Sequence, residues 1–448
     1  MSIFKAYDIR GLVPDELDEK LAEQIGIAFT NILQEETNKT ALTLLTARDM
    51  RPSGHRLIDA LHAGITKAGA DVIDINMTTT PMFYYAVGFK NIDGGLVCTA
   101  SHNPAQYNGF KLVRKQSVPV SADTGIKEIE KRIREKRFRL ADKTGTIREE
   151  TIYAAYAQKI LSLAENTDKK LKVAIDAGNG MAGLYIDLFV ELGFEIIPLF
   201  FRQDGTFPNH EANPLKHETL TTLQKVAKTE KTDFSVAFDG DADRAIFLDE
   251  TGKIIPADFI TALISTKILE KNKGAVIIYD VRSSRIVKET IEQLGGIAIR
   301  ERVGHSFIKA RMRKENSIFG GELSGHYYFE TMYTTDNALL ACVNVANILR
   351  RRNEPLSQLI EPFKKYRQSG EINFRVEDKK TMMQKLADAF SSGEIDWVDG
   401  VTVQFDSWWF NVRPSNTEPL LRLNLEASTD AELSERLNEL KRILGNPI

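Results

Sequence analysis

The chain has 448 residues, 42% of them hydrophobic, and at roughly 100–150 residues per domain it is too long for one compact core, so we expect three to four domains. Its 59 Lys and Arg residues against 62 Asp and Glu residues give a net charge of −3 without a basic tail or stripe, which argues against a nucleic-acid partner. Two distant cysteines in apolar surroundings, no signal-like N-terminus and no apolar run of about 18 residues predict a cytoplasmic protein with no membrane association.

Short apolar runs alternate with helical patterns through the first three quarters of the chain. The run at 41–47 precedes a predicted helix over 54–68, and further apolar runs follow at 71–77 and 94–100. The same rhythm restarts at 171–180 and at 274–281, as expected of βαβ units. We therefore predict three similar mixed α/β domains, over residues 1–150, 151–253 and 254–366. The charged helical stretch 126–143 is interpreted as a solvated face or connector.

The pattern changes after Asn353. A helix is followed by strand patterns at 370–378, 398–406, 408–414 and 420–427 and then by a charged final helix. This order is typical of a small α+β domain with an antiparallel sheet. We predict such a domain over residues 367–448.

A serine follows the fourth apolar run, in the segment Thr99–Pro104. Ligands bind in loops at the carboxyl ends of parallel strands, so Ser101 is a candidate nucleophile, although a lone serine here is more often a turn or cap residue. His102 is not expected to act as its base, because consecutive side chains of extended backbone point apart. A G-x-S-x-G elbow is absent, which argues against an esterase-like triad.

Three aspartates alternate with small residues after the apolar strand 233–238. Asp239, Asp241 and Asp243 can turn inward on a tight loop and offer hard oxygen ligands to one divalent cation. The alternative is a merely solvated acidic loop. Arg244 adds a fixed positive charge suited to a phosphate oxygen.

Two further loops carry groups suited to a sugar phosphate. In the segment 320–326, glycines allow close approach while Glu322 and Ser324 can hydrogen-bond vicinal hydroxyls. In the segment 413–419, Arg413, two hydroxyls and backbone amides can cradle a phosphate. Ordinary turns are the alternative interpretation of both loops.

A glycine pattern at Gly178, Gly180 and Gly183 matches G-x-G-x-x-G after a strand. A dinucleotide fingerprint requires an acidic residue at the end of the next strand, and here Asp204 is displaced into the following turn. Nicotinamide binding is therefore disfavoured.

Taken together, these motifs resemble the α-D-phosphohexomutase family, and they occur in the family's order over essentially the whole chain. The resemblance implies three α/β domains and a smaller C-terminal domain around a central cleft. It implies that Ser101 is carried as phosphoserine, and that its phosphate and the three aspartates hold Mg²⁺.

The same resemblance assigns the remaining site residues. It implies that sugar hydroxyls are bound by Glu322 and Ser324, and that the non-reacting phosphate is bound by Arg413, Ser415, Asn416 and Thr417. Groups near the reacting phosphate are expected to be Tyr7, Arg10, Lys111 and Arg244. Further cleft residues are expected to be Arg282, His305 and His326. Some relatives carry a lysine at the position of Arg282. A general base is required, with Lys111 and His326 as candidates.

The resemblance implies an enzyme that interconverts hexose 1-phosphate and hexose 6-phosphate through a hexose 1,6-bisphosphate. The expected sugar is mannose or glucose. The enzyme is expected to be a monomer or a weak dimer. The bisphosphorylated sugar must bind in two orientations, and its distal phosphate must be bound in both. This requirement predicts hinge motion of the last domain. Three alternatives remain open. They are a phosphoglucosamine mutase, a metal-dependent phosphatase with Asp239 as nucleophile, and a sugar-phosphate-binding module without turnover.

Overall fold

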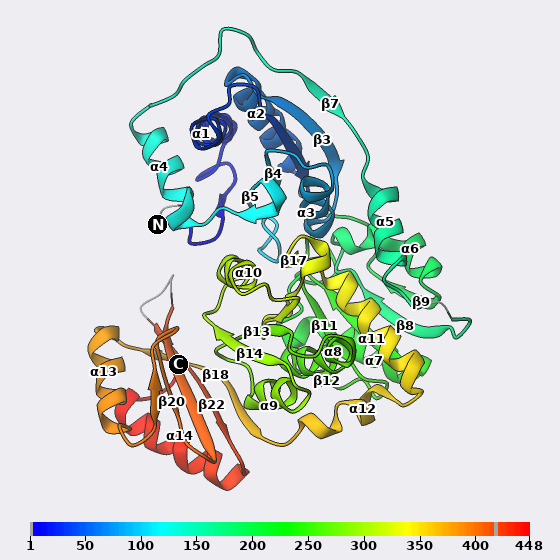
Figure 1. The fold of residues 1–448 in the computed structure, drawn as a ribbon, viewed down its shortest axis with the longest axis vertical. Coiled ribbons are helices and arrows are strands. Elements are labelled where there is room, and N and C mark those ends of the chain that lie inside the picture. The colour runs from blue at the N-terminus through cyan, green and yellow to red at the C-terminus, as the bar shows by residue number, and fades with distance from the viewer. Residues whose placement is uncertain (1–2, 166, 416–419) are drawn as a thin grey trace.

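The computed structural model describes residues 3–165, 167–415 and 420–448. Four β-sheets follow one another along the chain, each covered by its own helices (Figure 1). The sheet orders are β1-β5-β4-β2-β3-β7, with β6 beside β5, then β12-β11-β10-β8-β9, β14-β13-β15-β16-β17 and β18-β22-β21-β20-β19. We refer to the four parts built on these sheets as units one to four.

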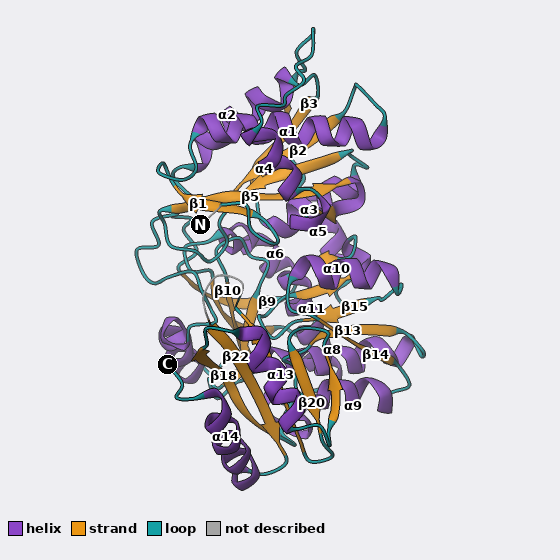
Figure 2. Cartoon of the chain, turned by 90° about the vertical axis from the view of Figure 1, so that its left-hand side faces the viewer, coloured by secondary structure: helices purple, strands orange, loops and turns teal. Residues whose placement is uncertain are grey.

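Unit one carries helices on both faces of its sheet. Its strands are β1 (Ile9–Leu12), β2 (Thr43–Arg48), β3 (Asp71–Met77), β4 (Gly94–Cys98), β5 (Tyr107–Arg114), β6 (Val118–Pro119) and β7 (Ile147–Glu149). Its α-helices are α1 (Glu19–Thr37), α2 (Gly54–Lys67), α3 (Thr80–Phe89) and α4 (Ile126–Arg134). Because neighbouring strand residues face opposite sides, Leu44 packs in the core with α1 and α2, whereas Leu45 packs in the core with α3. Figure 2 shows these helices above and below the sheet.

The charged stretch 126–143 is helical only as far as Arg134. Lys136 adopts a left-handed backbone conformation (φ 51°), which stops the helix, and the chain then runs as a connector to β7. The sequence prediction of one continuous helical stretch is therefore wrong in its second half.

Units two and three share one hydrophobic core, and the side of the unit-one sheet that packs on α3 belongs to the same core. Unit two contains α5 (Tyr153–Leu161), β8 (Leu171–Asp176), α6 (Ile186–Glu191), β9 (Phe194–Leu199), α7 (Thr221–Glu230), β10 (Phe234–Phe238), β11 (Ala245–Leu248) and β12 (Ile254–Ile255). Unit three contains α8 (Ala257–Lys271), β13 (Val276–Asp280), α9 (Arg285–Gln293), β14 (Ile297–Glu301), α10 (His305–Lys314), β15 (Phe319–Gly321), β16 (Tyr327–Phe329), β17 (Thr335–Asp336), α11 (Ala338–Arg352) and α12 (Leu356–Leu359). In each unit, parallel strands are followed by an antiparallel edge, so all three α/β sheets are mixed.

Unit four has a wholly antiparallel sheet and a separate core. It contains β18 (Arg367–Arg375), α13 (Lys379–Ala389), β19 (Glu394–Asp396), β20 (Val401–Gln404), β21 (Trp408–Pro414), β22 (Leu420–Ala427) and α14 (Asp430–Leu444). The predicted fold class, three similar α/β domains and a smaller α+β domain, is confirmed.

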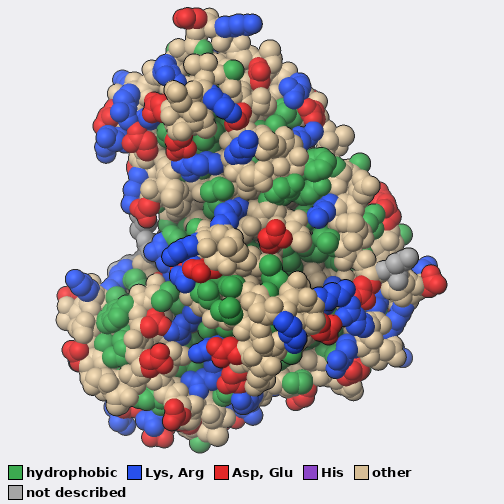
Figure 3. All heavy atoms as spheres, viewed as in Figure 1, with side chains coloured by type: hydrophobic (Ala, Val, Ile, Leu, Met, Phe, Trp, Pro, Cys, Tyr) green, Lys and Arg blue, Asp and Glu red, His purple; other side chains and the backbone are tan. Residues whose placement is uncertain are grey.

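The four units form one molecule with a notch on one side. Unit one lies at the top of Figure 1, units two and three form the middle, and unit four lies at the lower left. The space-filling view shows the surface hollowed between unit one and unit four (Figure 3). Among the residues that the structure describes, no helix is both long and apolar enough to cross a bilayer.

Candidate active site

Loops from units one, two and three meet at one point. The Ser101 loop follows β4, the aspartate loop follows β10, and the segment with Glu322 follows β15. A Cβ added to Gly240 would lie 2.4 Å from the carbonyl oxygen of Ser101, so the first two loops are in direct backbone contact. Arg244 and His326 form a β-bridge that brings the third segment against the second.

Ser101 is buried and has a left-handed backbone (φ 48°). Its hydroxyl donates to Asp239 Oδ2 at 2.6 Å. The Ser101 Oγ also lies 3.2 Å from Nδ1 of His102. The expectation that His102 points away is therefore wrong, because it assumed extended backbone, whereas the left-handed serine turns the two side chains toward each other. Burial, followed by the charges of Arg244 and Arg10, lowers the pKa of His102 well below its usual range.

The three aspartates form a buried cluster. Asp239, Asp241 and Asp243 each offer an oxygen within 4.8 Å of the others. Lys111 from β5 reaches into the cluster, with Nζ 2.7 Å from Asp241 Oδ2 and 2.5 Å from Asp243 Oδ2. Oδ1 of Asp241 and Oδ1 of Asp243 are buried without a hydrogen-bond partner. Buried carboxylate oxygens in this number are hard ligands that fit a divalent cation, so the cluster could hold a metal ion.

The aspartates differ in their proton affinity. Burial raises the pKa of Asp239 well above its usual range, and the charges of Asp243 and Asp241 add to the effect. Burial would raise the pKa of Asp243 too, but the charges of Lys111 and His326 outweigh it and hold that pKa well below its usual range.

His326 lies between two carboxylates. Its Nε2 is 3.4 Å from Asp243 Oδ1, and its Nδ1 is 3.2 Å from Glu322 Oε2 and 2.9 Å from Ser324 Oγ. Burial and the charge of Arg244 would lower the pKa of His326, but the two carboxylates outweigh them and raise it to about 9. His326 is then an imidazolium at neutral pH, so its 3.2 Å contact with Arg244 Nε joins two cations and is not a hydrogen bond.

Lys111 is also a cation. Burial would lower the pKa of the Lys111 amine, but Asp241 and Asp243 outweigh burial and raise it well above its usual range. Both candidate general bases, Lys111 and His326, therefore carry a proton in the protein as it stands.

Glu322 is held in place by several groups of unit three. Its Oε1 accepts from the Gly304 amide at 3.1 Å, and its Oε2 accepts from the Tyr328 hydroxyl at 2.7 Å. Arg282 places Nη2 3.6 Å from Glu322 and 2.6 Å from Asp280. Arg282 is thus held beside the predicted sugar-binding carboxylate.

Tyr7 and His305 join units one and three. The Tyr7 hydroxyl donates to the carbonyl of Val303 at 3.1 Å, and its ring lies 5.6 Å from the ring of His305. His305 lies in turn 6.2 Å from the His326 ring. Burial, followed by the charges of Glu322 and Asp399, raises the pKa of Tyr7 to about 12, so its hydroxyl stays protonated.

Arg10 reaches the Ser101 loop from β1. Its Nη1 donates to Asn103 Oδ1 at 2.7 Å, and its Nη2 pairs with Asp8. Arg10 therefore contacts the loop that carries Ser101.

The described residues of the predicted phosphate loop, 413–415, belong to unit four. Arg413, 7% exposed, pairs with Glu371 of β18 at 2.6 Å. Burial, followed by the charge of Arg282, lowers the pKa of Arg413, so the two guanidinium groups influence each other across the boundary between units three and four. Ser415 is buried at the end of β21. The predicted residues Asn416 and Thr417 lie outside the described residues.

Two features of the site escaped the sequence prediction. Thr80, at the start of α3, donates to Asp241 Oδ2 at 2.6 Å. Lys309 of α10 and Asp336 of β17 form a buried pair at 2.9 Å, and Asp336 lies with Asp243 and His326 in a second group of possible metal ligands. Lys309 and Lys111 already neutralise that second group. The only sequence signal for Lys309 is its position one helical turn after His305.

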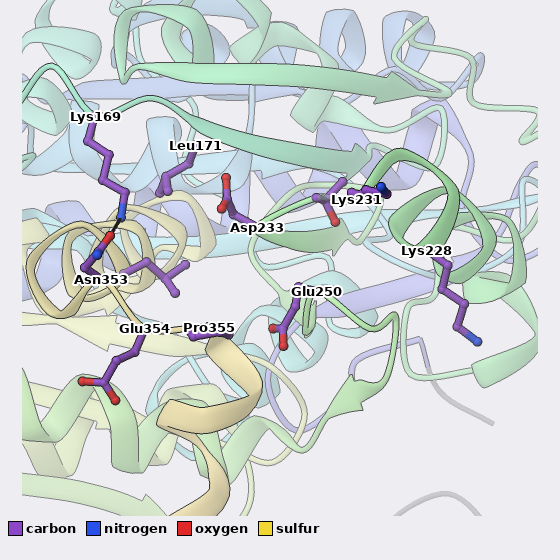
Figure 4. A pocket seen from close by; sticks show the side chains of 11 residues that line it. Lys169, Leu171, Lys228, Lys231, Asp233, Glu250, Asn353, Glu354 and Pro355 are labelled. Atoms are coloured by element: carbon purple, nitrogen blue, oxygen red, sulfur yellow. Dashed lines mark hydrogen bonds between the residues drawn. The ribbon is translucent and has the colours of Figure 1, made fainter.

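A pocket of about 430 Å³ lies elsewhere, between β8, the end of α7 and the end of α11 (Figure 4). Its polar lining residues include Lys169, Lys228, Asp233, Glu250 and Asn353, and the side chain of Lys169 points to Asn353. None of the predicted site residues that the structure describes lines this pocket.

Comparison with known proteins decides the family. Profiles of the phosphoglucomutase/phosphomannomutase α/β/α domains I, II and III match residues 1–140, 152–252 and 256–366, and the profile of the C-terminal domain matches residues 371–443. The chain belongs to the phosphoglucomutase/phosphomannomutase family. The family's named members are mutases, which are enzymes of the isomerase class. The predicted resemblance is thereby confirmed.

Individual relatives match this family member along its whole length. "Phosphohexose mutases" of Xanthomonas campestris pv. campestris is 39% identical, with 98% of each chain covered. "Phosphomannomutase" of Vibrio cholerae is 37% identical, over 99% of this chain and 98% of that one. The crystal structure of a phosphoglucomutase/phosphomannomutase family protein from Burkholderia thailandensis is 34% identical and superposes with a TM-score of 0.92, over 99% of this chain and 96% of that one.

Proposed function

We propose that this protein interconverts hexose 1-phosphate and hexose 6-phosphate, with mannose or glucose as the hexose, through a phosphoserine at Ser101 and a hexose 1,6-bisphosphate. The observation that carries the proposal is the Ser101 hydroxyl at 2.6 Å from Asp239, in a cluster of three buried aspartates with Lys111 and Arg244 around it. A serine that serves only as a turn or cap residue does not require buried carboxylates and cations around its hydroxyl.

Mg²⁺ is the cation that we propose for the aspartate cluster. Asp239, Asp241 and Asp243, with an oxygen of the Ser101 phosphate, would hold it. When bound, the ion supplies charge stabilisation for the transferring phosphoryl oxygens, which is the main catalytic demand of phosphoryl transfer.

The cationic side chains share this task in the proposal. A phosphorylated Ser101 would add a charge of about −1.5 to −2 in a buried place. Arg244, 3.8 Å from Asp239, and Lys111 lie close enough to offset it. Because Lys111 and His326 are both protonated, their first role is to stabilise charge, and either must lose its proton before it can act as the base for the attacking hydroxyl.

The remaining groups would bind and orient the sugar. Glu322 and Ser324, with Arg282 beside them, offer acceptors and donors for hydroxyl groups. Arg413 and Ser415 of unit four are proposed to hold whichever phosphate is distal, together with Asn416 and Thr417. Because the bisphosphate must turn over between the two transfers, its two ends are best held by different units of the protein.

A metal-dependent phosphatase with Asp239 as nucleophile is the weaker reading. Asp239 Oδ1 accepts from the amides of Asp243 and Arg244 at 3.1 and 3.2 Å, and Oδ2 accepts from Ser101. Both carboxylate oxygens are therefore engaged, whereas a nucleophile needs one that is free to attack.

The test is an assay with Mg²⁺, a trace of glucose 1,6-bisphosphate, and glucose 1-phosphate or mannose 1-phosphate, in which the 6-phosphates are measured. We expect Ser101→Ala to lower the rate by at least about 10³-fold, equivalent to about 4 kcal/mol. The control is Ser162→Ala, because the Ser162 hydroxyl bonds only the carbonyl of Lys159 on an exposed helix end. Release of inorganic phosphate by the wild type, or full activity of Ser101→Ala, would refute the proposal.

A further inference from the structure

The guanidinium of Arg51 is bound to four main-chain carbonyls of the Ser101 loop. Nη1 donates to the carbonyls of Pro104 at 2.7 Å and Tyr107 at 2.9 Å. Nη2 donates to the carbonyls of Ser101 at 2.8 Å and Asn103 at 2.6 Å. The Arg51 side chain is fully buried, so these bonds are made without competition from water.

Arg51 is itself held from both sides. Its Nε lies 3.3 Å from Asp49 Oδ2, and its amide donates to Asp49 Oδ1 at 2.9 Å. From unit two, the ring of Phe207 covers the guanidinium at 5.1 Å. Gly205 approaches so closely that an added Cβ would lie 2.5 Å from the Cα of Arg51. The arginine is therefore fixed between the two units whose loops carry Ser101 and the aspartates.

The loop needs such support because Ser101 is left-handed. A non-glycine residue at φ 48° is in a region that costs about 1–2 kcal/mol and persists only where its surroundings enforce it. This backbone conformation directs the hydroxyl to Asp239. Four bonds from one rigid, planar group to the carbonyls on the other side of the loop oppose relaxation of the backbone to a commoner conformation.

We infer that Arg51 is a positioning residue for phosphoryl transfer, which fixes the Ser101 loop so that Oγ stays aligned with the reacting phosphate in both halves of the reaction. The inference rests on the proposed function. Arg51 bonds the main chain and not the reacting atoms, so it acts through Ser101. Substrate affinity depends on other units, which carry Glu322 and Arg413.

Arg51→Lys is the informative variant because it retains the positive charge. An ammonium group has three donors at one point, so it cannot reach four carbonyls spread over residues 101–107. We expect kcat to fall about 10- to 100-fold, as for a misplacement of about 1 Å at a reacting group. The KM for glucose 1-phosphate should change by less than about threefold. The matched control is Arg56→Lys, in which the exposed Arg56 pairs only with Glu19.

Hydrogen–deuterium exchange of the peptide covering 99–107 gives a readout that does not need activity. Faster exchange in Arg51→Lys than in Arg56→Lys, with a selective fall in kcat, supports the inference. Unchanged exchange, wild-type kcat, or a parallel change in kcat and KM overturns it. If Arg51→Lys does not fold, Phe207→Leu replaces it, because this variant removes only the aromatic ring over the guanidinium. Its exchange over 99–107 and its kcat and KM are then judged in the same way. A wild type without mutase activity would refute the proposed function instead, and exchange would still test the anchoring of the loop.

Discussion

At the residue scale, the main electrostatic feature of the site is the repulsion among the three neighbouring carboxylates of the aspartate loop. Three buried carboxylates would repel one another by several kcal/mol at intermediate dielectric, and Lys111 at 2.7 and 2.5 Å from two of them provides the compensation. Oδ1 of Asp241 and Oδ1 of Asp243 still have no hydrogen-bond partner. A divalent cation would satisfy them, which leads to a prediction on stability.

We expect millimolar Mg²⁺ to raise the thermal midpoint of the wild type and to have little effect on Asp241→Asn. A ligand at 100 times its dissociation constant stabilises the folded state by about 2.7 kcal/mol, and losing one of three carboxylate ligands removes most of that gain. Differential scanning fluorimetry with EDTA and then Mg²⁺ measures the shift. The control is Asp204→Asn, because the Asp204 carboxylate lies outside the cluster and bonds only Thr206. An equal shift in Asp241→Asn would place the cation elsewhere.

Glu322 is the second residue whose charge we expect to matter. It accepts from Gly304 and Tyr328 and lies 3.2 Å from His326. Glu322→Gln retains the size but loses the charge, so we expect kcat/KM for the sugar phosphates to fall about 10- to 100-fold, as on loss of a charged hydrogen-bond partner in a buried site. Steady-state kinetics would measure the fall. Glu330→Gln, at an exposed glutamate of the same unit, is the control and should match the wild type.

At the scale of elements, the loops after β4 and β10 are in backbone contact at Gly240. A Cβ there would lie 2.4 Å from the Ser101 carbonyl oxygen, and backbone cannot yield as a flexible side chain can. We expect Gly240→Ala to separate the serine from the aspartates and to lower kcat at least about 10-fold. In Gly54→Ala, the nearest atom would be 3.5 Å away, so that variant is the control. Wild-type kcat in Gly240→Ala would show that the contact is not needed.

A second prediction concerns the packing of α8 on α11. Lys267 of α8 donates to Asn344 Oδ1 of α11 at 3.0 Å, and burial lowers the pKa of the Lys267 amine from 10.5 to about 8. Below pH 8 the folded protein must keep a poorly solvated ammonium, whereas between pH 8 and 10.5 the unfolded chain binds more protons than the folded one. The stability of the wild type should therefore rise with pH in that window.

Lys267→Met removes this dependence. We expect it to be more stable than the wild type at pH 7 by about 1 kcal/mol, a figure discounted for partial exposure, and the difference should shrink toward pH 10. Urea denaturation at both pH values measures it. Lys271→Met, at an exposed lysine of the same helix, serves as the control. A difference that is constant with pH would contradict the prediction.

At the scale of the whole molecule, unit four contacts unit three through hydrogen bonds and ion pairs of several side chains, among them Arg285, Arg300 and Gln368. Arg285 at the start of α9 donates to the carbonyls of Asp406, Phe405 and Trp408 at 2.6, 3.0 and 3.2 Å. Unit four has its own hydrophobic core, and the connecting strand β18 carries a bulge between Gln368 and Glu371. Motion of unit four as a rigid body about this connection is consistent with these contacts.

We therefore expect unit four to close when a bisphosphate spans the site. In Ser101→Ala, which prevents turnover, glucose 1,6-bisphosphate should reduce the radius of gyration measured by small-angle X-ray scattering. The ligand's distal phosphate would replace Glu371 as the partner of Arg413 and draw the units together. Adding Arg413→Ala to Ser101→Ala should abolish the contraction. An unchanged radius in Ser101→Ala alone would rule out closure on this scale.

The sequence by itself determined the elements and their chemistry. Short continuous apolar runs specify strands buried on both faces, so the α/β units could be predicted from their length and from the helical patterns between them. The change of pattern after Asn353 likewise predicted the antiparallel last unit. The spacing of Asp239, Asp241 and Asp243 in one short loop likewise indicates a cation site, because neighbouring residues of a loop are also neighbours in space.

Contacts between distant segments were decided only by the tertiary structure. No local pattern indicates that Arg51 binds the carbonyls of 101–107, that Lys309 lies beside Asp336, or that Glu371 pairs with Arg413. His102 was predicted wrongly because a backbone torsion at Ser101, enforced by packing from other segments, reversed the direction that extended chain would give. The identity of a side chain determines which kinds of bond it can make. Which residue it bonds depends on how the units pack against one another, and this packing is a property of the whole folded chain.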